Sequence, residues 1–490
     1  MSTLAQPSGA SSGAPSGASS GAPSGPSSEA SSGASPGAPS GAPAGESVAP
    51  DEASSDRLAG AAGGGRRSLR DNLRDNLLGG PGRVLGADIA RGIAVLGMFT
   101  AHVGVTSDDL ATFEGWLSLA HGRSSILFAT VAGLSLALVT GGSRPLAGEA
   151  MRTARARILV RVVLLLALVA VLDLFGTRVL LILGFYAAYF VLALPFLRMP
   201  PARLAAISVG IAVVGPVLVY YGPEVLARAG LRAPHDGSGA ATDFLLTGHY
   251  PALVWMAYVL AGLALGRCDL RSPTLHLGLV AGGFGLAALT SVASAVMVAD
   301  AGGLTTVEGQ VAVTSSQYVQ PPPTWSDPWP PLAGLYLEGP HDDTTFEALG
   351  SGGFALGVLG LCLLLGSVAR GGAREGTQEG KQEGGLRRVA RGVVLTVTTP
   401  LAAVGALALT VYSLQIVTIW WWTRTYWDLL DPATNTPLGW MVVVTLVLAT
   451  AWRALLGRGP LERLFGWVAK RAFPDRSASR SASSSSSATS

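Results

Sequence analysis

Apolar segments of roughly 17 to 25 residues recur along the chain, and shorter polar stretches separate them. A segment of that length crosses the hydrocarbon core of a bilayer as an α-helix. The segments lie at 86–106, 123–142, 157–175, 178–197, 204–222, 250–266, 275–298, 348–369, 397–421 and 437–456. The pattern therefore predicts an all-α, polytopic integral membrane helix bundle with about ten transmembrane helices.

Basic residues set the orientation of such a bundle, because Lys and Arg are enriched in cytoplasmic loops. A cluster of arginines stands before the first apolar segment: Arg66, Arg67, Arg70, Arg74 and Arg83. Ten alternating spans leave few of the 34 Lys and Arg residues outside: Arg123, Arg178, Arg228, Arg232 and Arg424. We expect both termini in the cytoplasm and a multi-pass protein of the cell (plasma) membrane.

The regions outside the apolar segments divide the chain. Residues 1–82 form a Ser/Gly/Ala/Pro-rich stretch that cannot bury a core, so we expect a disordered cytoplasmic tail. Residues 83–470 form the transmembrane domain, and 471–490 form a second disordered, Ser-rich tail. Two extracytoplasmic loops, at about 223–249 and 299–347, are long enough to bind something. The second is rich in Pro, which disfavours regular helix, and we expect it to lie over the outer face as a lid.

The composition agrees with a membrane protein. The chain of 490 residues is 49% hydrophobic and 13% charged, with a formal net charge of +3 and a mean hydropathy of +0.44, which excludes an ordinary soluble class. No nucleic-acid partner is implied, and the lipid bilayer is the expected partner. The two cysteines cannot form a disulfide framework, and we expect both to be reduced.

Histidines gather at the expected outer ends of the spans. His102 ends the first span, His121 stands at the entrance of the second, and His249 precedes the sixth. His341 lies in the long outer loop. Imidazole titrates near neutral pH and serves as a general base or as a transient acyl acceptor. We interpret His121 and His102 as catalytic candidates, and His249 and His341 as substrate-binding candidates. The alternative is that these side chains satisfy only local hydrogen bonds.

The inner end of the first span carries Asp88 and Arg91, which are three residues apart and therefore share a helix face. Arg91, together with Arg157 and Arg161 of the third span, suits the phosphates of a cytoplasmic cofactor, and we interpret Asp88, Arg91, Arg157 and Arg161 as cofactor-binding candidates. Asp88 and Arg91 could equally form a structural ion pair. The eleven residues from Arg91 to His102 cover about 16 Å along a helix.

Trp325 and Trp329 in the long outer loop are candidates for stacking on a sugar ring, although an interfacial aromatic belt explains them equally well. The sequence shows no metal-ligand spacing, no nucleotide-binding loop and no Gly-x-Ser-x-Gly elbow.

Two stretches resemble the heparan-alpha-glucosaminide N-acetyltransferase catalytic-domain family of polytopic membrane proteins: VLGADIARGIAVLGMFTAHV and HGRSSILFATVAGLSLAL. Asp88, Arg91 and Gly92 match the Asp-x-x-Arg-Gly signature of that family, and His121 stands where the family has its catalytic histidine. The resemblance implies an acyltransferase that moves an acetyl or other acyl group from cytoplasmic acetyl-CoA or another acyl-CoA to a glycan or other cell-envelope acceptor outside.

The later segments TGHYPALVWMAYVLAGLALGRCDL, FEALGSGGFALGVLGLCLLL and RGPLERLFGW resemble a bacterial family of multi-pass membrane proteins of unknown function. Two other classes of protein fit the same pattern. A multi-span transporter of a small molecule would show inverted repeats with broken helices that meet near the midplane. In a non-catalytic membrane scaffold, the histidines and Asp88 would be dispensable.

Overall fold

The computed structural model describes residues 75–77, 79–80, 83–177, 179–231, 240–316, 323–370, 385–425 and 433–474. The two predicted tails lie outside these residues almost entirely. The described residues contain helices and no strand, as the hydrophobic pattern predicts.

The long helices follow the apolar segments. They are α3 (Leu85–Val103), α5 (Arg123–Val139), α6 (Gly148–Asp173), α7 (Ile182–Ala193), α8 (Pro201–Arg228), α10 (Ala252–Gly266), α11 (Pro273–Asp300), α13 (Thr345–Arg370), α14 (Gly385–Ala406), α15 (Ala408–Thr425), α16 (Thr436–Leu456) and α17 (Pro460–Ala472). Short helices connect them: α4 (Phe113–Ser118), α9 (Ala240–Thr242), α12 (Leu304–Thr314), a π-helical turn (Asp243–Thr247) and 3₁₀ turns (Leu194–Arg198 and Leu332–Tyr336).

Six of the described helical segments are long and apolar enough to cross a membrane: Phe113–Val139, Pro201–Arg228, Pro273–Asp300, Thr345–Arg370, Arg388–Ala406 and Thr436–Leu456. Together they make this a multi-pass helical membrane protein. The count of about ten spans and the cytoplasmic position of the termini stay predictions.

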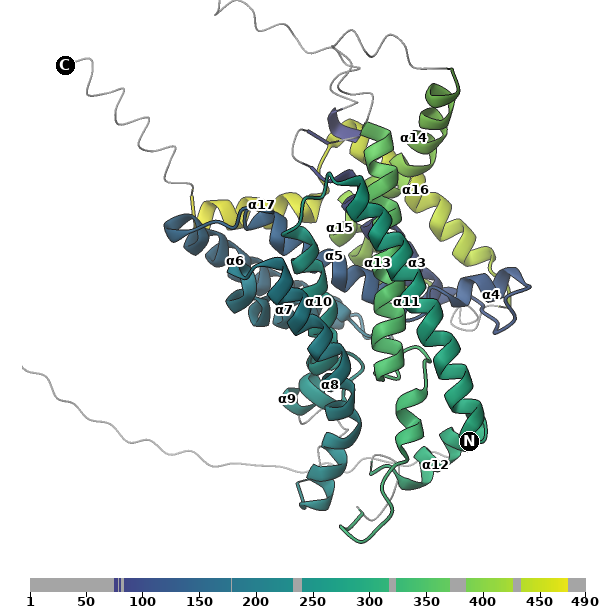
Figure 1. Ribbon diagram of the computed structural model, residues 1–490. Coiled ribbons are helices and arrows are strands. Elements are labelled where there is room, and N and C mark those ends of the chain that lie inside the picture. The colour runs from purple at the N-terminus through teal and green to yellow at the C-terminus, as the bar shows by residue number, and fades with distance from the viewer. Residues whose placement is uncertain are drawn as a thin grey trace, which may run out of the picture. The chain divides into compact units, whose positions relative to one another are not determined.

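Four helices, α3, α5, α10 and α13, supply most of the buried core (Figure 1). The α5–α10 contact is close because both helices place glycine at the crossing. A Cβ built on Gly133 would stand 1.9 Å from the Val259 carbonyl oxygen, and one built on Gly262 would stand 1.8 Å from that of Thr130. Around this centre, α14 packs on α3, α8 packs on α10, and α11 packs along α13.

The predicted ninth span, 397–421, is not one helix: α14 ends at Ala406 and α15 begins at Ala408. In an unbroken helix the Leu409 N–H would donate to the Gly405 carbonyl. Here the Gly405 carbonyl accepts from Arg91 Nη1 at 3.1 Å, and Leu409 N donates to Glu462 Oε1 at 2.9 Å. Side chains from α3 and α17 therefore satisfy the backbone groups that the break exposes, which hydropathy alone could not reveal.

The loop 299–347, for which we predict an extracytoplasmic position, also differs from the extended lid expected of it. Its first part is helical, as α12, because the prolines that disfavour helix begin only at residue 321. In addition, α8 continues to Arg228 and so occupies the first part of the predicted loop 223–249. A buried ion pair of Arg228 with Glu224, at 2.6 Å, lies in this extension.

Candidate functional site

Arg91 is tied into the inner part of the bundle by three helices. Its guanidinium donates to Asp88 Oδ1 at 2.8 Å on its own helix, to Ser135 Oγ at 2.8 Å on α5, and to the Gly405 carbonyl on α14. Asp88 is buried and also accepts from Arg83. The predicted ion pair of Asp88 with Arg91 is thus confirmed, and Arg91 also fixes the break between α14 and α15.

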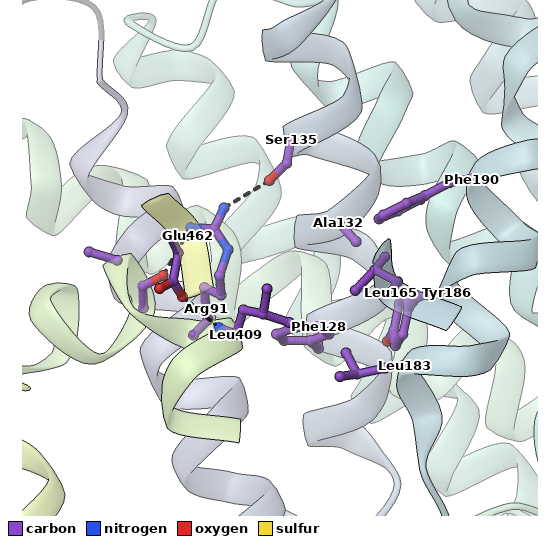
Figure 2. Close-up of a pocket in the computed structure, with 13 residues that line it drawn as sticks. Arg91, Phe128, Ala132, Ser135, Leu165, Leu183, Tyr186, Phe190, Leu409 and Glu462 are labelled. Atoms are coloured by element: carbon purple, nitrogen blue, oxygen red, sulfur yellow. Dashed lines mark hydrogen bonds between the residues drawn. The ribbon is translucent and has the colours of Figure 1, made fainter. Parts of the chain in front are cut away.

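Arg91 lies at one end of a cavity of about 280 Å³ (Figure 2). The polar side chains Arg91, Ser135 and Glu462 line this cavity, and the rest of its wall is apolar or aromatic. The other lining residues are Phe128, Ala132, Leu165, Leu183, Tyr186, Phe190, Gly405, Ala406, Ala408 and Leu409. An apolar space whose polar end holds an arginine and a carboxylate suits an extended, partly apolar ligand with polar groups at one end.

Glu462 reaches this cavity from α17. Its carboxylate accepts from the backbone N–H of Leu409 and from the backbone N–H and hydroxyl of Thr410, at 2.9, 3.1 and 2.6 Å. These groups form the first turn of α15, where a carboxylate is favoured by the unpaired N–H groups and by the helix dipole. The cap thus anchors α17 to the cavity wall.

The other two predicted cofactor ligands lie on α6. Arg161 stands one helical turn before Leu165, which lines the cavity. Arg157 lies a turn further away and donates twice to the Phe473 carbonyl at the end of α17, at 2.9 and 2.7 Å. Neither arginine lines the cavity: Arg161 lies one helical turn from a lining residue, and Arg157 contacts the end of α17.

A second group of polar side chains gathers around His341. Its ring is nearly parallel to that of Trp255, with centroids 6.2 Å apart, and is edge-on to Tyr250 at 5.3 Å. The ring of His249 lies 6.4 Å away. The structure thus brings together the two predicted substrate-binding histidines, one from the start of α10 and one from the loop before α13.

The turn that carries His341 is held by Glu347. Its carboxylate accepts from the backbone N–H of His341 at 2.8 Å and from that of Asp343 at 2.7 Å. Asp343 in turn accepts from Trp255 Nε1 at 3.1 Å. Burial, and then the neighbouring Glu347 carboxylate, raise the pKa of Asp343 well above its usual range. Burial also lowers the pKa of His341, and His249 lowers it further, so the neutral imidazole is favoured.

His121 joins this group from the turn before α5. A Cβ built on the adjacent Gly122 would stand 3.2 Å from Pro340 Cβ and 3.5 Å from Glu347 Oε1, so the turn and the loop touch. His121 is close enough to His341 and to His102 to interact with both electrostatically. Nε2 of His121 is buried and has no hydrogen-bond partner within the described residues.

His102 lies on the other side of His121, at the end of α3. Its Nδ1 is 2.7 Å from Nε2 of Gln415, a buried side chain of α15. The two catalytic candidates and the two substrate-binding candidates therefore lie one after another, from His102 through His121 to His341 and His249.

The two tryptophans proposed for sugar stacking lie elsewhere. Arg228 stacks over Trp329 at 4.1 Å, and the Trp325 ring is 6.1 Å from that of Trp329. The start of α13 contacts α8 at Val213, where Thr345 Oγ1 donates to the carbonyl at 3.4 Å. Fifteen residues, or about 22 Å of helix, separate Val213 from Arg228. The structure does not bring these tryptophans to the histidine group.

Several contacts of the site went unnoticed in the sequence. Glu347 had a usable signal, because Thr344 and Glu347 form the Thr-x-x-Glu pattern of a capping box, and Glu347 N donates to Thr344 Oγ1 at 3.1 Å. Gln415 had a weaker one, as an amide inside an apolar segment. Ser135 and Glu462 had no signal in the sequence, because their hydrogen-bond partners lie on helices that are distant in sequence.

Comparison with known proteins gives a match to a family model. Residues 83–283, from just before α3 into α11, match the model of the family described as heparan-alpha-glucosaminide N-acetyltransferase, catalytic. No curated protein matches the chain, and no solved structure matches it. The matched segment is less than half of the chain. It contains Asp88, Arg91, His102, His121 and His249, whereas His341 lies beyond it.

Proposed function

We propose that this protein is a membrane acetyltransferase that takes the acyl group from acyl-CoA, with acetyl-CoA as the first candidate, and passes it to an amino sugar or related envelope acceptor. The carrying observation is that the cavity at Arg91 is lined by α5, the helix that begins two residues after His121. Phe128 and Ser135 line it at a spacing of seven residues, and His121 stands seven residues before Phe128. Phe128 and Ser135 therefore share one side of α5, and His121 stands two residues before Arg123, where this helix begins.

The dimensions favour an extended thioester arm. Twelve residues separate Ser135 from Arg123, the first residue of α5, or about 18 Å of helix, and His121 stands two residues earlier. Arg91 and Arg161 would hold phosphates or carbonyls at the inner end, where two arginines offer charge-assisted hydrogen bonds. The apolar wall between them would carry the arm, and the thioester would arrive below His121.

The chemistry expected at His121 is general-base catalysis. Nε2 takes the proton from the acceptor hydroxyl or amine while the acceptor oxygen or nitrogen forms a bond to the thioester carbonyl carbon. The carbon–sulfur bond then breaks, and the thiolate takes the proton back from His121, so that the imidazole ends neutral and free CoA thiol leaves. A neutral imidazole is required at the start, and partial burial of His121 favours that form.

The test is the release of CoA thiol by the full chain in nanodiscs, with acetyl-CoA as donor and glucosamine as acceptor. His121→Asn is expected to lose activity by roughly 100- to 10,000-fold, as for a lost general base. His276→Asn is the matched control, because His276 is buried on α11 and contacts the Leu270 carbonyl, away from the proposed catalytic group. Near-normal transfer by the His121 variant would refute the proposal.

One observation favours a second candidate, a transporter. The break between α14 and α15 places the end of one helix and the start of another beside the cavity, as in the discontinuous helices of transporters. Proteoliposomes separate the two functions. A transferase with glucosamine outside and acetyl-CoA added inside forms acetylglucosamine outside, whereas a transporter moves labelled glucosamine inward unmodified.

A further inference from the structure

The turn that precedes α13 contains two residues with a strained backbone conformation. His341 has φ 66° and Asp343 has φ 52°, and within the described parts of the chain these are the non-glycine residues with positive φ. Side chains with a Cβ rarely adopt this region, and such outliers cluster at functional sites where the surroundings enforce them. The strained turn is therefore a candidate functional site, and the side chains that it carries are His341 and Asp343.

Glu347 holds the two strained residues in this conformation. It is 3% exposed, and its two carboxylate oxygens each accept one backbone N–H from the two strained residues. Thr344 completes the arrangement, since its hydroxyl accepts from Glu347 N and donates to the Leu337 carbonyl. Glu347 therefore holds the backbone of the turn, and contacts with Trp255 and Tyr250 define the position of the His341 ring.

That position leaves one nitrogen of His341 without a protein partner. The ring forms a hydrogen bond to the His249 backbone, while its buried Nδ1 has none among the residues that the structure describes. His121 shows the same feature at Nε2. A buried polar atom without a partner is unfavourable by comparison with one that is hydrogen-bonded, so native proteins rarely leave one without a reason. Two such nitrogens in one neighbourhood point to a ligand that bonds both.

We propose that His341 is a second imidazole of the active site, which binds the nucleophilic hydroxyl or amine of the acceptor opposite His121, and that Glu347 is the positioning residue that sets His341 there. This inference rests on the proposed acyl transfer and adds the acceptor subsite to it. The site would then be completed by a residue outside the segment that matches the acetyltransferase family.

The aromatic surroundings fit an acceptor of this class. Trp255 and Tyr250 enclose the His341 ring with apolar faces and edges, and a sugar ring packs well against such surfaces. Asp343 accepts from Trp255, which fixes the indole relative to the turn. The pocket therefore offers hydrogen bonds at its two imidazoles and flat apolar contact beside them.

The experiment separates acceptor binding from donor chemistry in the full chain in nanodiscs. Calorimetry measures binding of glucosamine, and thiol release from acetyl-CoA is followed with and without glucosamine. His341→Asn is expected to weaken glucosamine binding and to raise its KM at least tenfold, with a smaller loss of donor-only thiol release than in His121→Asn. Glu347→Gln should do the same, because its amide nitrogen cannot accept from a backbone N–H. Glu308→Gln, exposed on α12, is the matched control.

Each outcome has a distinct meaning. Unchanged glucosamine affinity in His341→Asn overturns the acceptor subsite even if the wild type transfers the acetyl group. Equal loss of donor-only thiol release in His341→Asn and His121→Asn also overturns it, because His341 would then act in the donor step. A wild type that binds glucosamine through His341 and releases no thiol supports the subsite and refutes the transferase. A wild type that neither binds nor acylates glucosamine overturns both.

Discussion

Gly92→Ala tests whether the close contact between α3 and α14 holds the inner site together. A Cβ built on Gly92 would stand 2.0 Å from the Leu401 carbonyl oxygen, and real Cβ atoms essentially never come closer than 3.0 Å. The two helices must therefore separate by about 1 Å. The same contact carries the hydrogen bond of Arg91 to the Gly405 carbonyl, already at 3.1 Å. A 1 Å displacement takes that bond beyond the usual range of hydrogen-bond lengths.

The magnitude follows from these two losses. Overpacking costs about 1 to 3 kcal/mol. Loss of a hydrogen bond from a charged donor costs about 1.5 to 3 kcal/mol. Gly92→Ala should thus lower the free energy of unfolding by roughly 2.5 to 6 kcal/mol. It should also weaken binding of acetyl-CoA.

Thermal unfolding in detergent and titration with acetyl-CoA measure the two effects. Gly285→Ala is the control, because nothing lies within 4 Å of its built Cβ on α11, and replacing glycine by alanine there is expected to be neutral or stabilising. A Cβ built on Gly405 meets the Asp88 carbonyl oxygen at 1.8 Å, so Gly405→Ala should resemble Gly92→Ala and the double variant should be less than additive. A Gly92→Ala protein with wild-type stability and donor affinity would refute the reasoning.

Three further predictions concern the donor, the outer carboxylate and the topology. Arg91→Ala should raise the KM for acetyl-CoA more than it lowers kcat, and exposed Arg271→Ala should do neither; steady-state kinetics with an unchanged donor KM would contradict the assignment. Asp343→Asn should raise the unfolding temperature at pH 7.5 and much less at pH 4.5. The folded state holds the Asp343 proton at pH values where the unfolded state has lost it, so wild-type stability falls as pH rises above the usual carboxyl pKa of 3.8; a larger gain at low pH would contradict this sign. A periplasm-active reporter fused after Pro323 should be active and one fused after Gln378 inactive, whereas the reverse pattern would overturn the ten-span prediction.

The parts of the site that the sequence revealed are those with local or periodic signals. Asp88 and Arg91 are three residues apart on one helix, so their ion pair follows from helix geometry. The convergence of His121, His249 and His341 followed from topology, because alternate spans return histidines to the same side of the bundle.

The parts that the sequence could not reveal depend on contacts between distant positions. The bond from Arg91 to Gly405 joins residues 314 apart, and the cap from Glu462 to Leu409 joins residues 53 apart. Hydropathy reports how apolar a segment is and contains nothing about which backbone groups lose their helical partners. The break at Leu407 was invisible for that reason. The two left-handed residues before α13 were equally hidden, since neither His nor Asp is a residue that a turn with positive φ requires.

The cap of α15 has a consequence for biosynthesis. Ribosomes release α14 and α15 well before α17, yet the N–H groups of Leu409 and Thr410 receive their acceptor only from Glu462 of α17. Until the final helix emerges, the break stays open and the cavity lacks one of its polar wall residues. A chain that stopped before residue 460 would therefore keep the long apolar helices α3 to α16 and still lack the cap of α15, so docking of α17 completes this wall of the cavity.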